Sequence, residues 1–271
     1  DALPISTARI KVLHRESELE RRVYDGTKTV DIVLDDVRVG DVVEYAYSLE
    51  GSNPVFSGTE FGRMDMQWRV PVHILHRRLT VPDNRAIVWR AHLQVAEPAV
   101  DHHDGWTDYV WHAADVPAVA RQGDTPGWYD PYAAVEWSEY RNWAAVARWA
   151  EPLYSVPERP RGSLRAEIDC IAASASGPQE RLREVLAFVQ SEIRYLGVEI
   201  GSGSHAPRLP EQVLARRYGD CKDKVLLAVA MLRSLGVSAH PALVHTRLRQ
   251  AVANTLPMPG AFNHVILRAE A

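Results

Sequence analysis

The chain has 271 residues, a formal net charge of −4, and a composition that is 46% hydrophobic and 24% charged. Such values are typical of a folded protein and argue against disorder. The slightly acidic balance, without any Lys/Arg run, excludes the basic surface that nucleic-acid binding needs, and no apolar stretch approaches the roughly 20 residues that span a bilayer.

The first half of the chain is predicted to be β-structure. Residues 8–14, 29–37 and 41–49 alternate apolar and polar side chains with period two, and turn residues such as Gly26 and Gly40 separate them. Further strands are predicted at residues 64–72, 73–81, 86–95 and 107–112. Short strands at this spacing favour an antiparallel β-sandwich-like domain.

Helical patterns begin after Pro131. Residues 138–150 are predicted to form an amphipathic helix that closes the first domain, and Pro157 to Gly162 resembles a linker. The sequence therefore predicts a β-rich domain at residues 1–156 and a second domain at 157–271. That second domain is predicted to hold three helices, at residues 164–175, from Pro178, and from Cys221 to Gly236, a loop at 201–210, and strands at 240–246 and 262–269. This order predicts an α+β fold.

The stretch Tyr218-Gly219-Asp220-Cys221-Lys222-Asp223-Lys224 carries the strongest chemical signal. Asp220 is suited to be the N-cap of the third helix, and Asp223 to complete a capping box, so Cys221 falls in the first turn. The positive end of the helix dipole favours thiolate there. The N–H groups of the first turn are unpaired within the helix, so the N–H of Cys221 itself can help to hold an oxyanion. The alternative is a buried apolar cysteine without chemistry, which is also our interpretation of Cys170.

A cysteine nucleophile needs a base, and the residues alone do not select one among His205, His240, His245 and His264. His264 lies mid-strand, and period two places it on the face of Phe262 and Ile266, which we expect to point inward. A histidine on such a face needs a hydrogen-bond partner, which a thiolate or an ordinary core group can supply.

Together these motifs resemble the transglutaminase-like core superfamily of papain-like fold. The resemblance rests on Gly219 to Lys224, Leu232-Arg233-Ser234-Leu235-Gly236-Val237, Phe262-Asn263-His264-Val265 and Ile193-Arg194-Tyr195, and covers roughly residues 165–271. The first half, with Gly40-Asp41-Val42-Val43-Glu44-Tyr45, is similar to the β-rich domain of unknown function (DUF3857-like) that often precedes this core in bacterial envelope proteins.

The resemblance implies a cysteine-dependent acyl transfer on amide bonds, with Cys221 as nucleophile and His264 as base, no cofactor, and a protein or peptide as substrate. It implies an oxyanion donor upstream of the cysteine, for which Tyr195 and Gln190 are the candidates. It also implies a periplasmic or envelope location. The third member of the family's site is an acid on the strand after the histidine, and we find no matching Asp in the seven positions from His264 to Ala271.

Other patterns are weaker. Hydrolysis and crosslinking stay equally open, and the rival hypothesis is a non-catalytic scaffold with an incomplete triad. His102-His103-Asp104 could hold a metal, but adjacent loop residues rarely reach one ion, so the sequence predicts no metal site.

The tryptophans gathered at residues 106–149, among them Trp128, favour core packing over ligand binding. Two cysteines exclude a disulfide framework, although one Cys170–Cys221 bridge stays open for an exported protein. The start Asp1-Ala2-Leu3-Pro4, without Met, indicates an excised or processed piece of a longer protein.

Overall fold

The computed structural model describes residues 9–14, 20, 22–35, 37–120 and 123–271. The chain divides into two compact units, each made of separate segments. Unit 1 consists of Asp1–Gly58, Val156–Pro241 and Leu267–Ala271, and unit 2 of Thr59–Ser155 and Ala242–Ile266. The predicted α+β class is confirmed, since unit 2 is built on antiparallel sheets and unit 1 on helices.

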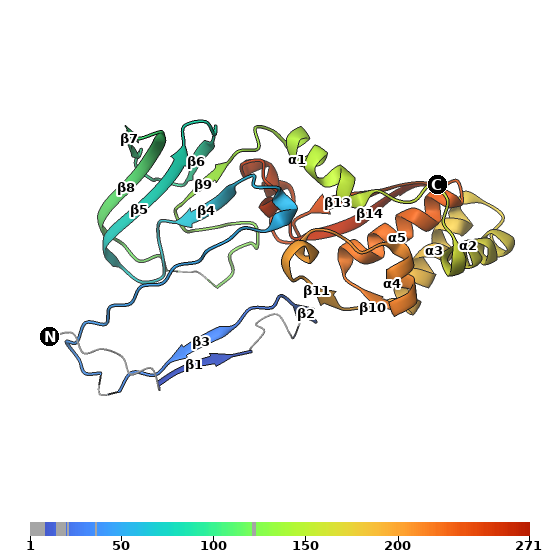
Figure 1. Cartoon of the computed structure of the whole chain (residues 1–271), viewed down its shortest axis with the longest axis horizontal. Helices are drawn as coiled ribbons and strands as arrows, with labels where there is room; N and C mark the ends of the chain where they lie inside the picture. The colour runs from blue at the N-terminus through green and yellow to red at the C-terminus, as the bar shows by residue number, and fades with distance from the viewer. Residues whose placement is uncertain (1–8, 15–19, 21, 36, 121–122) are drawn as a thin grey trace. The chain divides into compact units, whose positions relative to one another are not determined.

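Unit 2 contains two three-stranded antiparallel sheets (Figure 1). One has the order β4 (Phe61–Asp65), β9 (Ala134–Ser138), β6 (Val88–His92), and the other β5 (Val72–Pro82), β8 (Trp106–Val116), β7 (Ala99–His103). Buried side chains from both sheets form one core that includes Trp111 and Val135. The rings of Trp89 on β6 and Trp111 on β8 meet edge to face, with centroids 5.7 Å apart. The expectation of core packing therefore holds for Trp111.

The strand predicted at residues 41–49 is wrong. This segment forms no strand, and Val43 and Tyr45 are 49% and 75% exposed. The segment still alternates its side chains with period two. Tyr45 and Tyr47 lie on the same side, and their rings stack with centroids 6.4 Å apart. A strand also needs a hydrogen-bonded neighbour, and none lies beside this segment in the described part of the chain. Strands β7 and β9 were not predicted.

The rest of unit 2 follows these sheets. Helix α1 (Trp143–Ala150) follows its N-cap Asn142, whose side chain accepts the Ala145 N–H at 2.9 Å, and the 3-10 turn η4 (Glu151–Tyr154) continues from the helix. The segment from Ala242 to Ile266 returns to this unit and carries the 3-10 helices η6 (Arg249–Asn254) and η7 (Pro259–Ala261). The Glu136 carboxylate of β9 anchors the segment by accepting the Leu256 N–H at 2.9 Å.

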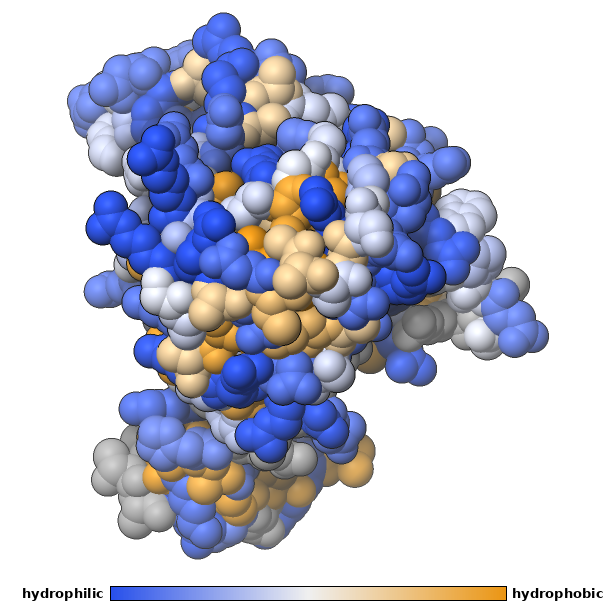
Figure 2. Space-filling view, turned by 90° about the vertical axis from the view of Figure 1, so that its right-hand side faces the viewer, coloured by the Kyte–Doolittle hydropathy of each residue, from blue (hydrophilic) through white to orange (hydrophobic). Residues whose placement is uncertain are grey.

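Unit 1 holds four helices within its described residues: α2 (Gly162–Ser174), α3 (Pro178–Glu192), α4 (Pro210–Arg216) and α5 (Cys221–Ser234). Helix α5 packs against the other three, and every residue from Leu226 to Leu232 is buried. An element that is apolar on all sides must lie inside the helical layer. Figure 2 shows the molecule from the side of α2 and α3 in Figure 1, where hydrophilic residues surround an apolar centre.

Short strand pairs complete unit 1. They are β1 (Ile10–Leu13) with β3 (Thr29–Ile32), antiparallel, and two parallel pairs, β2 (Val23–Tyr24) with β11 (Gly197–Val198) and β10 (Arg194–Tyr195) with β12 (Tyr218–Gly219). Strands β13 (Ser238–Val244) and β14 (His264–Glu270) form a further two-stranded sheet, and the unit boundary falls within both of them.

Candidate active site

Cys221 is the first residue of α5, and the two aspartates beside it build the start of that helix. The Asp220 carboxylate accepts the N–H groups of Lys222 at 3.1 Å and Asp223 at 3.3 Å. The Asp223 carboxylate accepts the Asp220 N–H at 3.3 Å, which completes a capping box. Both aspartates are buried, while Cys221 is only partly buried. The thiol therefore lies at the positive end of the α5 dipole and within reach of solvent.

Gly219 is required by close packing against Asp223. A Cβ at this position would lie 2.6 Å from the Cβ of Asp223 and 3.0 Å from its Oδ2. Such a contact is far inside the normal carbon–carbon separation, so any side chain here would displace the capping aspartate.

Tyr195 reaches the thiol through the pairing of β10 with β12. Its partner across that pair is Gly219, and the Leu196 N–H donates to the Gly219 carbonyl at 3.1 Å. The Tyr195 hydroxyl makes a side-chain hydrogen bond with the Cys221 thiol. Burial, reinforced by the charges of Cys221 and Asp220, raises the pKa of Tyr195 well above its ordinary value. The phenol thus stays protonated at neutral pH and can donate a hydrogen bond beside the sulfur.

Gln190, the other candidate oxyanion donor, lies on an exposed position of α3, one residue after the buried Val189. The structure thus places one of the two candidates, Tyr195, directly against the cysteine.

His264 begins β14 and is partly buried. The residue before it, Asn263, is held by hydrogen bonds in unit 2. Its side-chain oxygen accepts the Thr246 N–H at 2.9 Å, and its backbone N–H donates to the Val244 carbonyl at 3.1 Å. Cys221 belongs to unit 1 and His264 to unit 2. Their pairing therefore stays a prediction.

The predicted inward face of this strand is wrong. Val265 is buried, whereas Ile266, which shares the face of His264, is 46% exposed. The strand begins only at His264, and Phe262 belongs to the preceding loop, where its ring packs on Trp143. The alternation counted from Phe262 therefore does not apply to β14.

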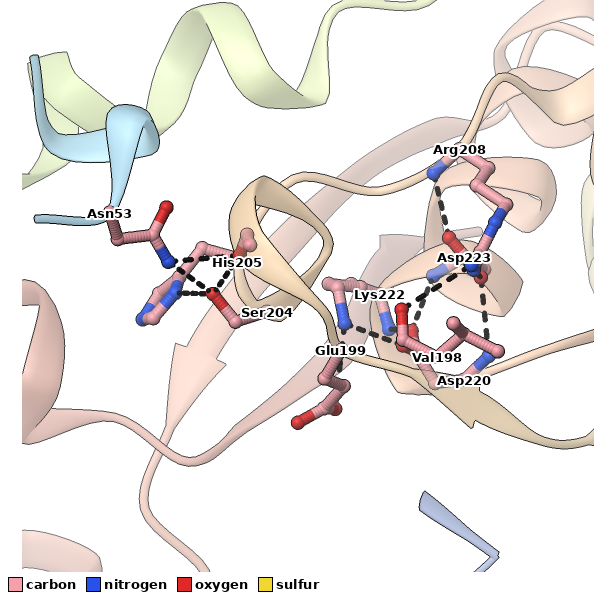
Figure 3. A network of polar contacts seen from close by, with 10 residues as sticks. Asn53, Val198, Glu199, Ser204, His205, Arg208, Asp220, Lys222 and Asp223 are labelled. Atoms are coloured by element: carbon pink, nitrogen blue, oxygen red, sulfur yellow. Dashed lines mark hydrogen bonds and ion pairs between the residues drawn. The ribbon is translucent and has the colours of Figure 1, made fainter. Parts of the chain in front are cut away.

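Lys222, directly after the cysteine, is buried (Figure 3). The sequence did not predict this burial. Lys222 is 3% exposed, and its ammonium lies 2.5 Å from an oxygen of Asp220 and 3.5 Å from one of Glu199. Burial raises the pKa of both carboxyls, while the ammonium opposes that rise. The first-turn lysine of a helix is usually solvated, so the sequence offers no signal for this cluster.

Arg208 joins the loop after β11 to the same helix start. Its backbone N–H and its guanidinium donate to the two oxygens of Asp223, at 2.7 Å and 2.8 Å, and a second guanidinium nitrogen donates to the Val198 carbonyl at 3.3 Å (Figure 3). Asp223 therefore caps the helix and fixes the loop at once.

His205 is close enough to Lys222 to feel its charge, and it is a neutral imidazole. Burial, and then the charge of Lys222, lower the pKa of His205 to about 4. Its Nδ1 lies 2.8 Å from the Ser204 hydroxyl, and its ring meets Phe56 edge to face at 4.9 Å. The 3-10 turns η3 (Pro54–Phe56) and η5 (Gly201–Ser204) are joined here, since the Asn53 side chain donates to Ser204 at 2.9 Å (Figure 3).

The remaining sequence candidates lie elsewhere. Cys170 is exposed on α2, so its predicted place in the core is wrong. His102 and His103 lie 2.8 Å and 3.2 Å from side-chain oxygens of Thr107 and Asp108. Within the described ranges, no group of three or more His, Cys, Asp or Glu side chains could hold a metal ion, and no helix is both long and apolar enough to cross a membrane.

Comparisons with known proteins agree with the resemblance seen in the motifs. Residues 2–120 match the model of DUF3857, a domain of unknown function with a solved structure, and residues 167–265 match the transglutaminase-like superfamily. No curated protein matches the sequence.

A solved structure with the same fold comes from Parabacteroides distasonis, where it is titled a "putative protease". The two chains superpose with a TM-score of 0.73 at 13% identity, over 98% of this chain and 51% of the other. The present chain therefore spans about half the length of that protein. At this identity the likeness shows the fold alone.

Proposed function

Since the chain joins a DUF3857 segment to a transglutaminase-like segment, we propose that it catalyses cysteine-dependent acyl transfer on amide bonds of a protein or peptide. The observation that carries the proposal is the position of Cys221 at the start of α5 with the Tyr195 hydroxyl hydrogen-bonded to its thiol. A protonated phenol and the backbone N–H of the nucleophile itself are donors of the kind that an acyl-transfer site needs beside its nucleophile.

In the proposed reaction the Cys221 sulfur attacks the amide carbonyl carbon, and the carbonyl electrons move to oxygen. The Tyr195 hydroxyl and the backbone N–H of Cys221 stabilise that oxyanion, since the N–H groups of Lys222 and Asp223 already donate to Asp220. The oxyanion collapses to a thioester as the C–N bond breaks, and His264 gives the departing amine the proton it took from the thiol. Water or a second amine then attacks the thioester and regenerates the thiol.

The proposal is tested by alkylating both cysteines with iodoacetamide over a range of pH and reading each site by mass spectrometry. Cys170 is a suitable internal control because it is exposed and belongs to the same chain. Thiols at helix N-termini or beside cationic groups titrate at about 3.5–7.5, against about 8.5 for a free thiol. We expect Cys221 to react rapidly well below pH 8.5 and Cys170 to follow the ordinary profile.

The histidine partner is tested in the same assay with His264→Ala, and with His240→Ala as the matched control on an exposed position of β13. The low-pH reactivity should disappear in the first variant and persist in the second. Equal profiles for Cys221 and Cys170 in the unmodified protein would favour the rival hypothesis, a scaffold without thiol chemistry.

A further inference from the structure

A second feature of unit 2 has the character of a binding site. A cavity of about 370 Å³ lies between the loop of residues 125–132 and the segment of residues 245–248, with Arg63 of β4 on its wall. We call it the Trp128 pocket. Small-molecule sites span about 300–1,000 Å³, so a cavity of this size suits a small ligand.

The aromatic wall of the pocket is exposed. Trp128 is 53% and Tyr129 46% solvent-accessible, and their rings meet at 87° with centroids 6.3 Å apart. The expectation that Trp128 packs in the core is therefore wrong. Two perpendicular exposed rings form a corner that can hold a flat apolar group by stacking on one ring and touching the edge of the other.

The acidic side of the pocket is already neutralised. Asp130 accepts from the Arg63 guanidinium at 2.5 Å through one oxygen and from the Tyr132 N–H at 3.0 Å through the other. The Arg63 guanidinium offsets the charge of this carboxylate, so the pocket does not favour a cationic ligand.

The segment of residues 245–248 contributes hydrogen-bond donors to the pocket. Arg247 lines the pocket, and its guanidinium forms no ion pair with any residue of the described part of the chain. The Nδ1 of His245 accepts the backbone N–H groups of Arg247 at 3.2 Å and Leu248 at 3.0 Å, so the neutral ring carries its proton on Nε2. Burial, and then the charge of Arg247, lower the pKa of His245, which keeps the ring neutral and donating.

The pocket is connected to the predicted base through unit 2 itself. His245 is followed by Thr246, whose N–H donates to Asn263 at 2.9 Å, and Asn263 immediately precedes His264. A ligand held in the pocket therefore lies at the end of the β13–β14 sheet where His264 begins its strand.

We propose that the Trp128 pocket is a substrate subsite that binds a carboxylate next to an aromatic or large apolar side chain, as at the C-terminal residue of a peptide. The carboxylate pairs with Arg247 and His245, and the side chain enters the corner formed by Trp128 and Tyr129. That this ligand is part of a peptide rests on the proposed function, whereas its chemistry rests on the pocket alone.

The test is calorimetric titration of the full chain with N-acetylphenylalanine, with N-acetylphenylalaninamide as the neutral analogue and N-acetylglucosamine as a neutral sugar. The titration is run on Cys221→Ser, so that thiol chemistry plays no part and a failure of the proposed reaction does not affect the outcome. The free acid should bind at least about tenfold more tightly than the amide, and the sugar should not compete.

Matched variants show which residues of the pocket cause the preference for the free acid. Arg247→Gln should abolish the preference for the acid, Trp128→Ala should weaken acid and amide alike, and Arg148→Gln, an exposed arginine of α1 outside the pocket, should change neither. Circular dichroism confirms that each variant is folded. Equal binding of acid and amide, no binding of either, an unaltered preference in Arg247→Gln, or displacement by the sugar would each overturn the proposal.

Discussion

Replacing Gly219 by Ala probes the link between the strand β12 and the capped start of α5. The added Cβ would stand 2.6 Å from the Cβ of Asp223. An ordinary carbon–carbon contact is about 3.5 Å, so one group must move by about 0.9 Å. Asp223 cannot yield freely, because its buried carboxylate accepts from the Asp220 N–H at 3.3 Å and from Arg208 at 2.7 Å and 2.8 Å.

The expected cost follows from these contacts. Overpacking a buried site costs about 1–3 kcal/mol, and losing one hydrogen bond to a charged group adds about 1.5–3 kcal/mol. Alanine also restricts the unfolded chain more than glycine does, and this effect stabilises the folded state by about 0.4–1 kcal/mol. We therefore expect Gly219→Ala to lower the free energy of unfolding by about 2–5 kcal/mol, measured by urea unfolding with far-UV circular dichroism, which reports mainly on the helices of unit 1.

The matched control is Gly123→Ala, where an added Cβ meets nothing within 4 Å and φ is not positive. This variant should be more stable than the unmodified protein by up to about 1 kcal/mol, because alanine restricts the unfolded chain. If Gly219→Ala unfolds at the same urea concentration as Gly123→Ala, the argument that Asp223 is fixed against β12 is refuted.

Further predictions concern the residues around the thiol. Tyr195→Phe should slow acylation of Cys221 by about 10²–10³-fold while leaving the urea midpoint nearly unchanged, as expected for the loss of one oxyanion donor; an unchanged acylation rate would exclude that role. Lys222→Met leaves the carboxylates of Asp220 and Glu199 without their cation. It should lower the free energy of urea unfolding by about 3–5 kcal/mol at neutral pH and by less in acid, where both carboxyls protonate. A loss of stability that does not change with pH would contradict this. His205 has a pKa of about 4 in the folded protein against 6.5 in the unfolded chain. Below pH 6.5 the unfolded chain therefore takes up a proton that the folded protein does not. The stability that the neutral His205 contributes is complete above pH 6.5 and is lost as the pH falls toward 4. His205→Gln should flatten the fall in stability over that window, and an unchanged pH profile would show that His205 is not its source.

The capped start of α5 could be predicted from sequence because capping is local. Asp220 and Asp223 are separated by the three positions that a capping box requires, and the observed helix begins at Cys221. The contact of Tyr195 with the thiol depends instead on a parallel bridge of only two residues, between β10 and β12. So short a strand has no measurable period, and the sequence suggests Tyr195 only through its resemblance to a family.

Errors arose where a pattern was assigned to the wrong face. On α2 the buried stripe runs through Leu164, Ile168 and Ile171, and Cys170 lies about 200° around the helix from Ile168, so it points outward. Ile266 was misplaced because the alternation was counted through a loop. The Lys222 ammonium contacts Asp220, two residues away, and also Glu199 of a distant segment, and no local pattern indicates the second contact.

The measurement that tests the central claim most directly is trapping of an acyl-enzyme. The full chain is mixed with p-nitrophenyl acetate, quenched in acid, digested, and each cysteine is examined for an acetyl thioester by mass spectrometry. The account predicts an acetyl group on Cys221 that forms much faster than on the exposed Cys170 and is lost in His264→Ala. Equal acetylation of the two cysteines, or none at Cys221, would contradict it.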